Sequence, residues 1–377
     1  MKQFYPLSTF LTEYSEKNGV NAYRPVAVGR YGIRTRESIY SKELAKDYSK
    51  NKLIHKNTLT VGMGSVQIDI GVLTDDITYS VSPAYHTYKI AGVNAEYLRY
   101  CLECRNQDMF SRFVKRGSRQ GKTIDLKRWM TYEIPVYDEN RQQEIVDRLN
   151  RISELIEKRQ EQLVQLSELV KSRFIELFGV YPLNPKGWET ATIRDIVADV
   201  RYGSSRPAVD GGKYPYLRMN NITYGGELDL TDTKRIDIPD NELDKCTVRR
   251  GDVLFNRTNS KELVGKTCVY NRDEMMVLAG FVIRVRVTER VLPEFLSAFL
   301  NTDFSKQMLL GMCKAAIGQA NINAQEMQNI GIYLPPTELQ RQFVQFKEQT
   351  DKSKLAVQKG LQELEILKKS LMQQYFG

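Results

Sequence analysis

Several features of membrane-bound and secreted proteins are missing from this sequence. It has no run of about 18 apolar residues, so we expect no membrane-spanning helix. The first residues, MKQFYPLSTFLTEYSEKNG, contain no apolar segment followed by a cleavage site, so we expect no secretory signal. The five cysteines are an odd number, scattered along the chain, which indicates free thiols in a reducing compartment. These absences predict a soluble, cytoplasmic protein.

Residues suited to catalysis or metal binding are also scarce. The only histidines are His55 and His86, and no serine or cysteine motif accompanies them, so we expect no nucleophilic catalysis. The CxxC pair CLEC (101–104) has neither a second CxxC nor a nearby histidine pair to complete a zinc site. We therefore expect its thiols to pack as small apolar side chains on a helix. GMGS (62–65) lacks the full frame of a phosphate-binding loop and predicts a turn after the strand TLTVG.

Positive charge and ordinary hydrophobic content are what the sequence does have. Its 377 residues suffice for two or three domains. With 41% hydrophobic and 27% charged residues, those domains can form normal cores. The net charge of +9 favours a polyanionic partner, such as nucleic acid or an anionic membrane surface.

One sequence ending occurs twice. KSRFIELFG (171–179) and KSLMQQYFG (369–377) both begin with Lys-Ser, end with Phe-Gly and close a long polar segment. Upstream, YEIPVYDENRQQEIV (132–146) resembles IYLPPTELQRQFV (332–344) if a two-residue slip aligns Pro135 with Pro335. Each copy has a strand-like end, a proline, a Gln/Arg-rich helix start and a long helix. Since this period is far longer than a solenoid repeat, the chain consists of two copies of one domain-plus-helix module.

Both long segments carry a heptad pattern of apolar residues. A helix of about 38 residues would be about 57 Å long. We expect the two helices to pack on each other as a coiled coil. The alternative is two unrelated amphipathic helices, each covering its own domain. The pattern consists of Ile145, Leu149, Ile152, Ile156, Leu163, Leu166, Val170 and Leu177 in the first helix, and Phe343, Val357, Leu361, Leu364, Leu371 and Tyr375, with weaker positions Lys347, Thr350 and Lys354, in the second.

The segments before the long helices predict a mixed, α+β architecture. In the second we expect a helix over 192–200, an alternating strand over 277–287, a helix over 293–312, a glycine-containing loop, and a short helix over 323–330. Further strands are expected over 214–219, 252–257 and 265–270. The first segment shows a similar order: 77–90 parallels the alternating strand, 95–114 parallels the helix, and 115–125 parallels the glycine-containing loop. Its front half aligns poorly with that of the second segment.

These features resemble the specificity subunit of type I restriction–modification systems. The residues that carry the resemblance are the two proline–Gln/Arg–helix–FG segments, GWE (187–189), RRGDVLFNR (249–257) and IGQANINAQEMQNIGIYLPP (317–336). KNTLTVGMG (56–64) replaces the RGDVLF-like strand in the first domain. The resemblance implies target recognition domains at 1–133 and 180–333. It also implies spacer helices at 134–179 and 334–377, which pair antiparallel with pseudo-two-fold symmetry.

The same resemblance implies a non-catalytic role in a larger assembly. Each domain would read one half of a bipartite sequence in double-stranded DNA. The helices would set the gap and dock two methyltransferase subunits, and restriction/translocase subunits would join them. S-adenosylmethionine, ATP and Mg²⁺ would bind those partners, and no cofactor, metal or membrane is expected on this chain. The absence of an Asn-Pro-Pro-Tyr motif, typical of adenine methyltransferases, is consistent with this division. Alternatives are a coiled-coil scaffold for two proteins, or the specificity part of a double-cutting, type IIB-like system.

Candidate DNA contacts are the loop residues whose side chains can read bases or bind phosphates. For a single residue, the commonest alternative is a solvated surface charge. The candidates in the first domain are Arg30, Tyr31, Arg34, Arg36, Arg116, Arg119, Gln120 and Lys122. Those in the second are Arg201, Tyr202, Ser204, Ser205, Arg206, Arg218, Asn220, Asn221, Arg257, Asn259, Lys261, Gln319 and Asn321.

Overall fold

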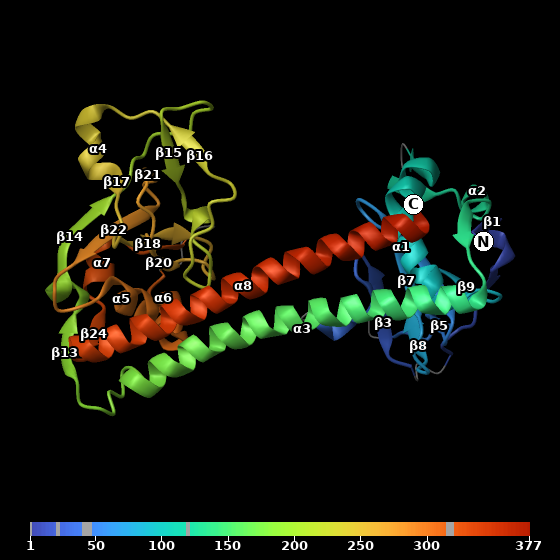
Figure 1. Cartoon of the computed structure of the whole chain (residues 1–377), viewed down its shortest axis with the longest axis horizontal. Helices are drawn as coiled ribbons and strands as arrows, with labels where there is room; N and C mark the ends of the chain where they lie inside the picture. Colours follow the sequence, from blue (N-terminus) through green and yellow to red (C-terminus); the bar gives the residue numbers. More distant parts are fainter. Residues whose placement is uncertain (1, 20–22, 40–46, 118–120, 314–319) are drawn as a thin grey trace. The chain divides into compact units, whose positions relative to one another are not determined.

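The computed structural model describes residues 2–19, 23–39, 47–117, 121–313 and 320–377, and divides into two compact units (Figure 1). Unit 1 comprises Met1–Glu161 and Gln358–Gly377, and unit 2 comprises Gln162–Val357. Two helices of 40 residues, α3 (Glu139–Phe178) and α8 (Thr337–Phe376), each begin in one unit and end in the other. Among the described residues, no helix has the length and apolar character needed to cross a lipid bilayer.

Unit 1 contains two four-stranded sheets and two two-stranded ribbons. The first sheet has the order β2 (Leu11–Tyr14), β9 (His86–Ile90), β6 (Thr58–Met63) and β7 (Ile68–Leu73). The second has the order β4 (Gly32–Thr35), β3 (Pro25–Gly29), β8 (Tyr79–Val81) and β5 (Lys52–Ile54). The ribbons pair β1 (Gln3–Pro6) with β12 (Glu133–Val136), and β10 (Val114–Gly117) with β11 (Gly121–Ile124).

Unit 2 repeats both four-stranded sheets and the first ribbon, whereas its second ribbon joins segments that are distant in sequence. Its first sheet has the order β14 (Val197–Tyr202), β22 (Val282–Val287), β18 (Val253–Asn256) and β20 (Thr267–Val269). Its second has the order β16 (Lys234–Ile236), β15 (Tyr214–Leu217), β21 (Met276–Leu278) and β17 (Thr247–Val248). The ribbons pair β13 (Glu189–Thr192) with β24 (Gly331–Leu334), and β19 (Thr258–Asn259) with β23 (Ala320–Asn321).

The matching strand orders confirm two homologous α+β domains, including the front halves that align poorly in sequence. Each second sheet contains one parallel pair, β3–β8 in unit 1 and β15–β21 in unit 2. Strand β6, from KNTLTVGMG, occupies the position that β18, from RRGDVLFNR, has in unit 2. The pattern of hydrogen bonding was retained although the side chains changed.

The helices place the repeat in one constant register. Helix α1 (Ala95–Phe113) corresponds to α5 (Pro293–Leu300) with α6 (Asp303–Met312), and α2 (Leu126–Trp129) corresponds to α7 (Ala324–Gln328). The same offset of 198 residues separates the first residues of each of these pairs: α1 and α5, α2 and α7, β12 and β24, and α3 and α8. The expected two-residue slip is therefore wrong, and Pro135 corresponds to Tyr333 instead of Pro335. Helix α4 (Asp240–Cys246) lies between β16 and β17 in sequence.

Five local expectations also need correction. The segment 192–200 forms a short 3₁₀ turn, Ile193–Ile196, followed by β14, because its β-branched residues pair with β22. Segments 77–90 and 277–287 each form two strands separated by a turn. Segment 293–312 forms two helices, because the Thr302 side chain accepts from Ser305 N–H and caps a new helix. Segment 115–125 is largely a hairpin of β10 and β11.

The repeated Phe-Gly ending has the same role in each unit. Phe376 is fully buried, and its ring meets Tyr97 of α1 at 5.1 Å between centroids. In unit 2 Phe178 is fully buried and meets Phe295 of α5 at 4.9 Å. Each unit therefore holds the start of one long helix and the end of the other in its core. The predicted heptad positions are all buried or half-buried, whereas Leu169 and Leu367, which lie off the heptad pattern, are exposed.

Candidate nucleic-acid interface

A short turn in unit 2, residues 278–281, brings together the segments that carry most candidate residues. Ser204 N–H donates to Leu278 O at 2.7 Å, and Ala279 N–H donates to Leu217 O at 2.9 Å. Arg257 N–H donates to Phe281 O at 3.0 Å. The ends of β14, β15 and β18 therefore meet at the turn between β21 and β22. Candidates that are distant in sequence lie at one edge of the two sheets.

Glycine permits the closest of these approaches. A Cβ atom on Gly203 would lie 2.1 Å from Leu278 O, which no real side chain tolerates. Gly280 N–H donates to Ser204 O at 2.7 Å on the other side of the same bridge. The turn is thus held by backbone hydrogen bonds and presents its side chains from a rigid support.

Arg257 and Tyr202 form the central pair of this edge. The Arg257 guanidinium lies over the Tyr202 ring at 4.9 Å from its centroid. Tyr202 Oη accepts from Ala324 N–H at the start of α7. Within the described parts of the chain Arg257 forms no ion pair, and its Nε is buried without a hydrogen-bond partner. Its guanidinium is therefore oriented by stacking and by a long hydrogen bond from Nη1 to Gly280 O at 3.5 Å, and its other terminal N–H groups remain for an external acceptor.

Three other candidate arginines are each paired with a carboxylate. Arg201 pairs with Asp199, Arg206 with Glu242, and Arg218 with Asp232, each at 2.8 Å. Hydrogen bonding to Arg206 lowers the pKa of Glu242 and raises that of Arg206, so this pair stays charged at neutral pH. An external phosphate must compete with these carboxylates for the same guanidinium donors.

The smaller polar candidates divide into buried and exposed groups. Ser204 and Asn221 are only 4% and 2% exposed, and both have internal hydrogen bonds: Ser204 Oγ accepts from Arg206 N–H, and Asn221 Nδ2 donates to Asp229 O. They hold their loops in shape. Asn259 Nδ2 donates to Asn256 Oδ1, and Asn321 Oδ1 accepts from Thr258 Oγ1, which leaves the second polar atom of Asn321 for other contacts. Asn321 is exposed, as are Ser205, Asn220 and Lys261.

Sequence reasoning missed one residue of this edge, Phe281. Its ring is 52% exposed although the Phe281 carbonyl accepts hydrogen bonds from Arg257 N–H and Asn256 Nδ2. An apolar ring held rigidly among the candidate residues suits contact with a thymine methyl or a base face. The preceding glycine, in LAGFV, was the sequence signal of a turn that presents this ring.

In unit 1 the β3–β4 hairpin presents a cationic aromatic cluster. Tyr31 is 71% exposed, and the guanidinium groups of Arg34 and Arg30 lie 4.7 Å and 5.7 Å from its ring centroid. Arg36 differs, because it packs over Tyr48 at 5.2 Å and its Nε is buried. The hairpin tip is therefore available for contact, whereas Arg36 has a structural environment.

The second group of unit 1 candidates lies on and beside the β10–β11 ribbon. Arg116 and Lys122 are partners in the strand register. Lys122 Nζ donates to Ser65 O in the β6–β7 turn and lies over the Phe110 ring at 5.3 Å. Arg119 and Gln120 in this hairpin, and Gln319 in unit 2, lie outside the described residues.

The motifs first weighed as catalytic or metal-binding have architectural explanations. Cys101 is fully buried in α1, and burial raises the pKa of its thiol to about 12, so the thiol packs as an apolar group. In GMGS the Tyr85 ring packs so closely on Gly62 that a Cβ there would lie 2.4 Å from it. Asp252 of RRGDVLF is buried, accepts from Arg249 N–H and pairs with Arg286 at 2.8 Å.

Comparison with known proteins identifies related chains. A family model described as the type I restriction modification DNA specificity domain matches residues 11–166 and 185–366. A putative type I restriction enzyme MjaX specificity subunit of Methanocaldococcus jannaschii is 27% identical over 196 residues, covering 51% of this chain and 46% of that protein. The type I restriction enzyme EcoKI specificity subunit of Escherichia coli K12 is 28% identical over 158 residues, covering 41% and 34%. The matched segments span less than half the length of either relative.

Two solved structures resemble the whole chain. One belongs to a study of the assembly and conformational transition of a type I R-M system, with a TM-score of 0.59, 18% identity, and coverage of 99% of this chain and 97% of that chain. The other is a type I restriction-modification S subunit from M. genitalium, with a TM-score of 0.56, 14% identity, and coverage of 100% and 96%. At such identities the likeness concerns the fold.

Proposed function

The chain belongs to the family of type I restriction modification DNA specificity domains, and from this we propose that it is the DNA-recognising, non-catalytic subunit of a type I restriction–modification complex. The observation that carries the proposal is the duplicated architecture, in which both units have the same sheets but different side chains at the sheet edge. S-adenosylmethionine, ATP and Mg²⁺ would then act on partner subunits.

Each unit would read one half of a bipartite target in double-stranded DNA. In unit 2 Arg257 would contact guanine or phosphate, with Asn321 and Asn259 beside it to read adenine. In unit 1 the Tyr31 cluster and the β10–β11 ribbon would make the corresponding contacts. Because these side chains differ between the units, the two half-sites would differ in sequence.

The long helices would set the unread gap between the half-sites. Each is an uninterrupted helix of 40 residues, about 60 Å long. Each end is anchored in a core, by Phe178 in unit 2 and by Phe376 in unit 1. Inserting one turn into both helices in register should therefore lengthen the gap, and methylation mapping that found an unchanged gap would contradict this function of the helices.

Exposed apolar residues support docking of two methyltransferase subunits on these helices. Grooves of about 450 Å³ in unit 1 and 130 Å³ in unit 2 overlap in the repeat. Both include the lysine of the repeated ending, Lys369 or Lys171, and the equivalent residues Cys104 and Thr302. Grooves that share these positions would suit two copies of one partner. The exposed apolar residues are Leu155, Val164, Leu169 and Ile175 on α3, and Leu355, Ile366 and Leu367 on α8.

The decisive test is methylation mapping of the native genome with this gene intact and deleted. Deletion should abolish methylation at one bipartite motif with a fixed gap. Loss of no motif, together with no methyltransferase co-purifying with the chain, would reject the proposal.

A variant then tests the candidate interface. Arg257→Ala should weaken DNA binding about 10- to 100-fold and relax one base position, as expected for loss of a bidentate contact worth about 1–3 kcal/mol. Arg250→Ala is the matched control, because Arg250 pairs with exposed Asp273 at 2.7 Å. Binding affinity should fall steeply with salt concentration, whereas a protein scaffold would show little salt dependence.

A further inference from the structure

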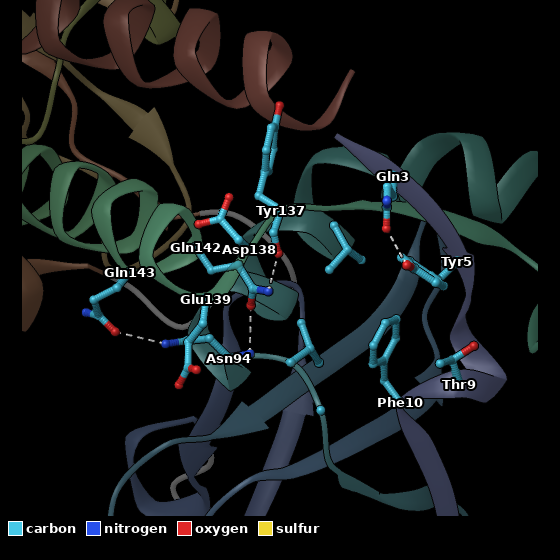
Figure 2. Close-up of a pocket in the computed structure, with 13 residues that line it drawn as sticks. Gln3, Tyr5, Thr9, Phe10, Asn94, Tyr137, Asp138, Glu139, Gln142 and Gln143 are labelled. Atoms are coloured by element: carbon cyan, nitrogen blue, oxygen red, sulfur yellow. Dashed lines mark hydrogen bonds between the residues drawn. The ribbon is translucent and has the colours of Figure 1, made fainter. Parts of the chain in front are cut away.

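Each long helix is tied to its domain by one buried glutamine near the helix start. In unit 1, Asn94 N–H donates to Gln142 Oε1 at 2.9 Å, and Gln142 Nε2 donates to Tyr137 O at 2.7 Å (Figure 2). Asn94 is the N-cap residue of α1, and Tyr137 lies just before α3. One side chain therefore connects the beginnings of two helices that are distant in sequence.

Unit 2 contains the same tie at the equivalent position. Leu292 N–H donates to Gln340 Oε1 at 2.8 Å, and Gln340 Nε2 donates to Pro335 O at 2.8 Å and to Arg290 O at 3.2 Å. Leu292 is the N-cap residue of α5. Gln142 and Gln340 are 198 residues apart, as are Asn94 and Leu292, and both glutamines are buried, with 5% and 0% exposure.

The chemistry of the tie explains why the same residue type stands at both positions. The helix start exposes an N–H group with no partner inside its own helix, and the segment before the long helix exposes a carbonyl. A primary amide satisfies both, because its oxygen accepts and its NH₂ group donates. The partners are backbone atoms, so the tie is kept although Asn94 corresponds to leucine and Tyr137 to proline.

The position of the tie determines what it controls. It lies within the first turn of α3 or α8, before the first buried heptad residue, Ile145 in α3 and Phe343 in α8. A small change in the direction of the helix axis at this end displaces the far end of the helix, and the displacement grows with the helix length of about 60 Å. We propose that Gln142 and Gln340 are positioning residues that fix the direction of each long helix relative to its recognition domain, and thereby the accuracy of the gap between half-sites. This inference rests on the proposed function.

A pocket of about 740 Å³ beside Gln142 leaves one side of this junction without close packing. It is lined by Gln3 and Phe10 on one side and by Asn94, Glu139 and Gln142 on the other (Figure 2). Gln143 adds one contact, because its Oε1 accepts from Asn94 Nδ2, but the Gln143 side chain is exposed and Asn94 is only half-buried. The buried tie of Gln142 to the backbone is therefore the more restrictive of the two glutamine contacts.

The test uses the full chain with its methyltransferase and a plasmid set whose half-sites are separated by the native gap or by one base pair more or fewer. Gln142→Met and Gln340→Met, singly and together, remove the hydrogen bonds while keeping side-chain length and helix propensity. The controls are Gln143→Met and Gln342→Met, at exposed positions of the same helices. We expect unchanged half-site sequences, at least a tenfold fall in the preference for the native gap in the double variant, and less than a twofold change in the controls. Gln340→Met should have the larger single effect, because Gln340 makes one more hydrogen bond.

Hydrogen exchange of the same full-length proteins provides an independent readout. The amides of Asn94 and Leu292 should exchange at least tenfold faster in the variants, with the remaining helix amides unchanged. Faster exchange with an unchanged gap preference would overturn the proposal. Loss of modification at every gap by a folded chain would also overturn it, because the glutamines would then be needed for binding itself. If the wild-type chain directs modification to no bipartite motif, the proposed function fails. Unchanged amide exchange of Asn94 and Leu292 in the variants would separately refute the tie.

Discussion

Lys306 of α6 is the buried cation whose replacement should most clearly alter the stability of unit 2. Its ammonium group has no hydrogen-bond acceptor among the described residues and lies over the Tyr224 ring at 4.6 Å. Burial, reinforced by the positive charges of Lys266 and Lys171, lowers the pKa of Lys306 from 10.5 to about 8. The folded protein therefore carries an unfavourable charge at neutral pH.

The magnitude follows from this pKa shift. A shift from 10.5 to about 8 corresponds to about 3 kcal/mol of destabilisation while the lysine is charged. The Tyr224 ring attracts the ammonium and offsets about 0.5–2 kcal/mol of it. We therefore expect Lys306→Met to stabilise unit 2 by about 1–3 kcal/mol at pH 7.

The direction of the pH dependence is also fixed. Below pH 8 the lysine is protonated in both states, so the full penalty applies. Between pH 8 and about 10.5 only the unfolded state retains the proton, so rising pH stabilises the fold and the advantage of Lys306→Met disappears.

Urea denaturation at pH 7 and pH 10 measures this difference. The chain has two tryptophans, Trp129 in unit 1 and Trp188 in unit 2, so a Trp129→Phe background lets fluorescence report unit 2. Lys245→Met, at an exposed position of α4, is the matched control and should change stability by less than 0.5 kcal/mol at either pH. A Lys306→Met protein that is less stable than the parent at pH 7, or a gain that persists undiminished at pH 10, would refute the reasoning.

Three further predictions concern the architecture that supports the interface. Asp252→Ala should destabilise unit 2 by about 3–5 kcal/mol in urea, because it leaves partly buried Arg286 without its carboxylate. Asp273→Ala, which breaks the exposed pair with Arg250, should leave the stability nearly unchanged, and equal effects of the two substitutions would contradict the role of burial. Gly203→Ala should lower the free energy of unfolding by about 2–4 kcal/mol, because the new Cβ meets backbone atoms, and it should weaken DNA binding through the 278–281 turn. The control Gly311→Ala, with open space around its Cβ, should stabilise α6 by up to about 1 kcal/mol. An unchanged stability of Gly203→Ala would show that the backbone contact at Gly203 is not close-packed. Phe376→Ala should cost unit 1 about 3–5 kcal/mol in a Trp188→Phe background, with exposed Gln374→Ala as control, and a loss below 1 kcal/mol would show that the repeated ending does not anchor the helix.

Local sequence signals determined the modular plan of this protein. The repeated ending and the 3.5-residue spacing of apolar positions act through residues within a few turns, so the two long helices and their buried positions were predictable. The helix over 95–114 and the short helix after Asn323 were predictable for the same reason, because their starts carry Asn side chains that cap the first turn. Side-chain chemistry alone also singled out Arg257, Tyr31 and Asn321.

Tertiary structure decided which candidates are available and how they are grouped. Arg206 meets Glu242 and Arg218 meets Asp232 only because loops fold back over 36 and 14 residues, and no local pattern encodes such encounters. Burial of Ser204 and exposure of Phe281 depend on the 278–281 turn, where the ends of three separate strands meet. Burial of Asn221 depends on the loop that brings Asp229 and Asp232 to it. The offset of 198 residues follows from the two Phe-Gly endings in the sequence, but its continuation without a slip into the domain helices required the structure. The paired roles of Gln142 and Gln340 also required it, because their partners are backbone atoms whose position is independent of residue type.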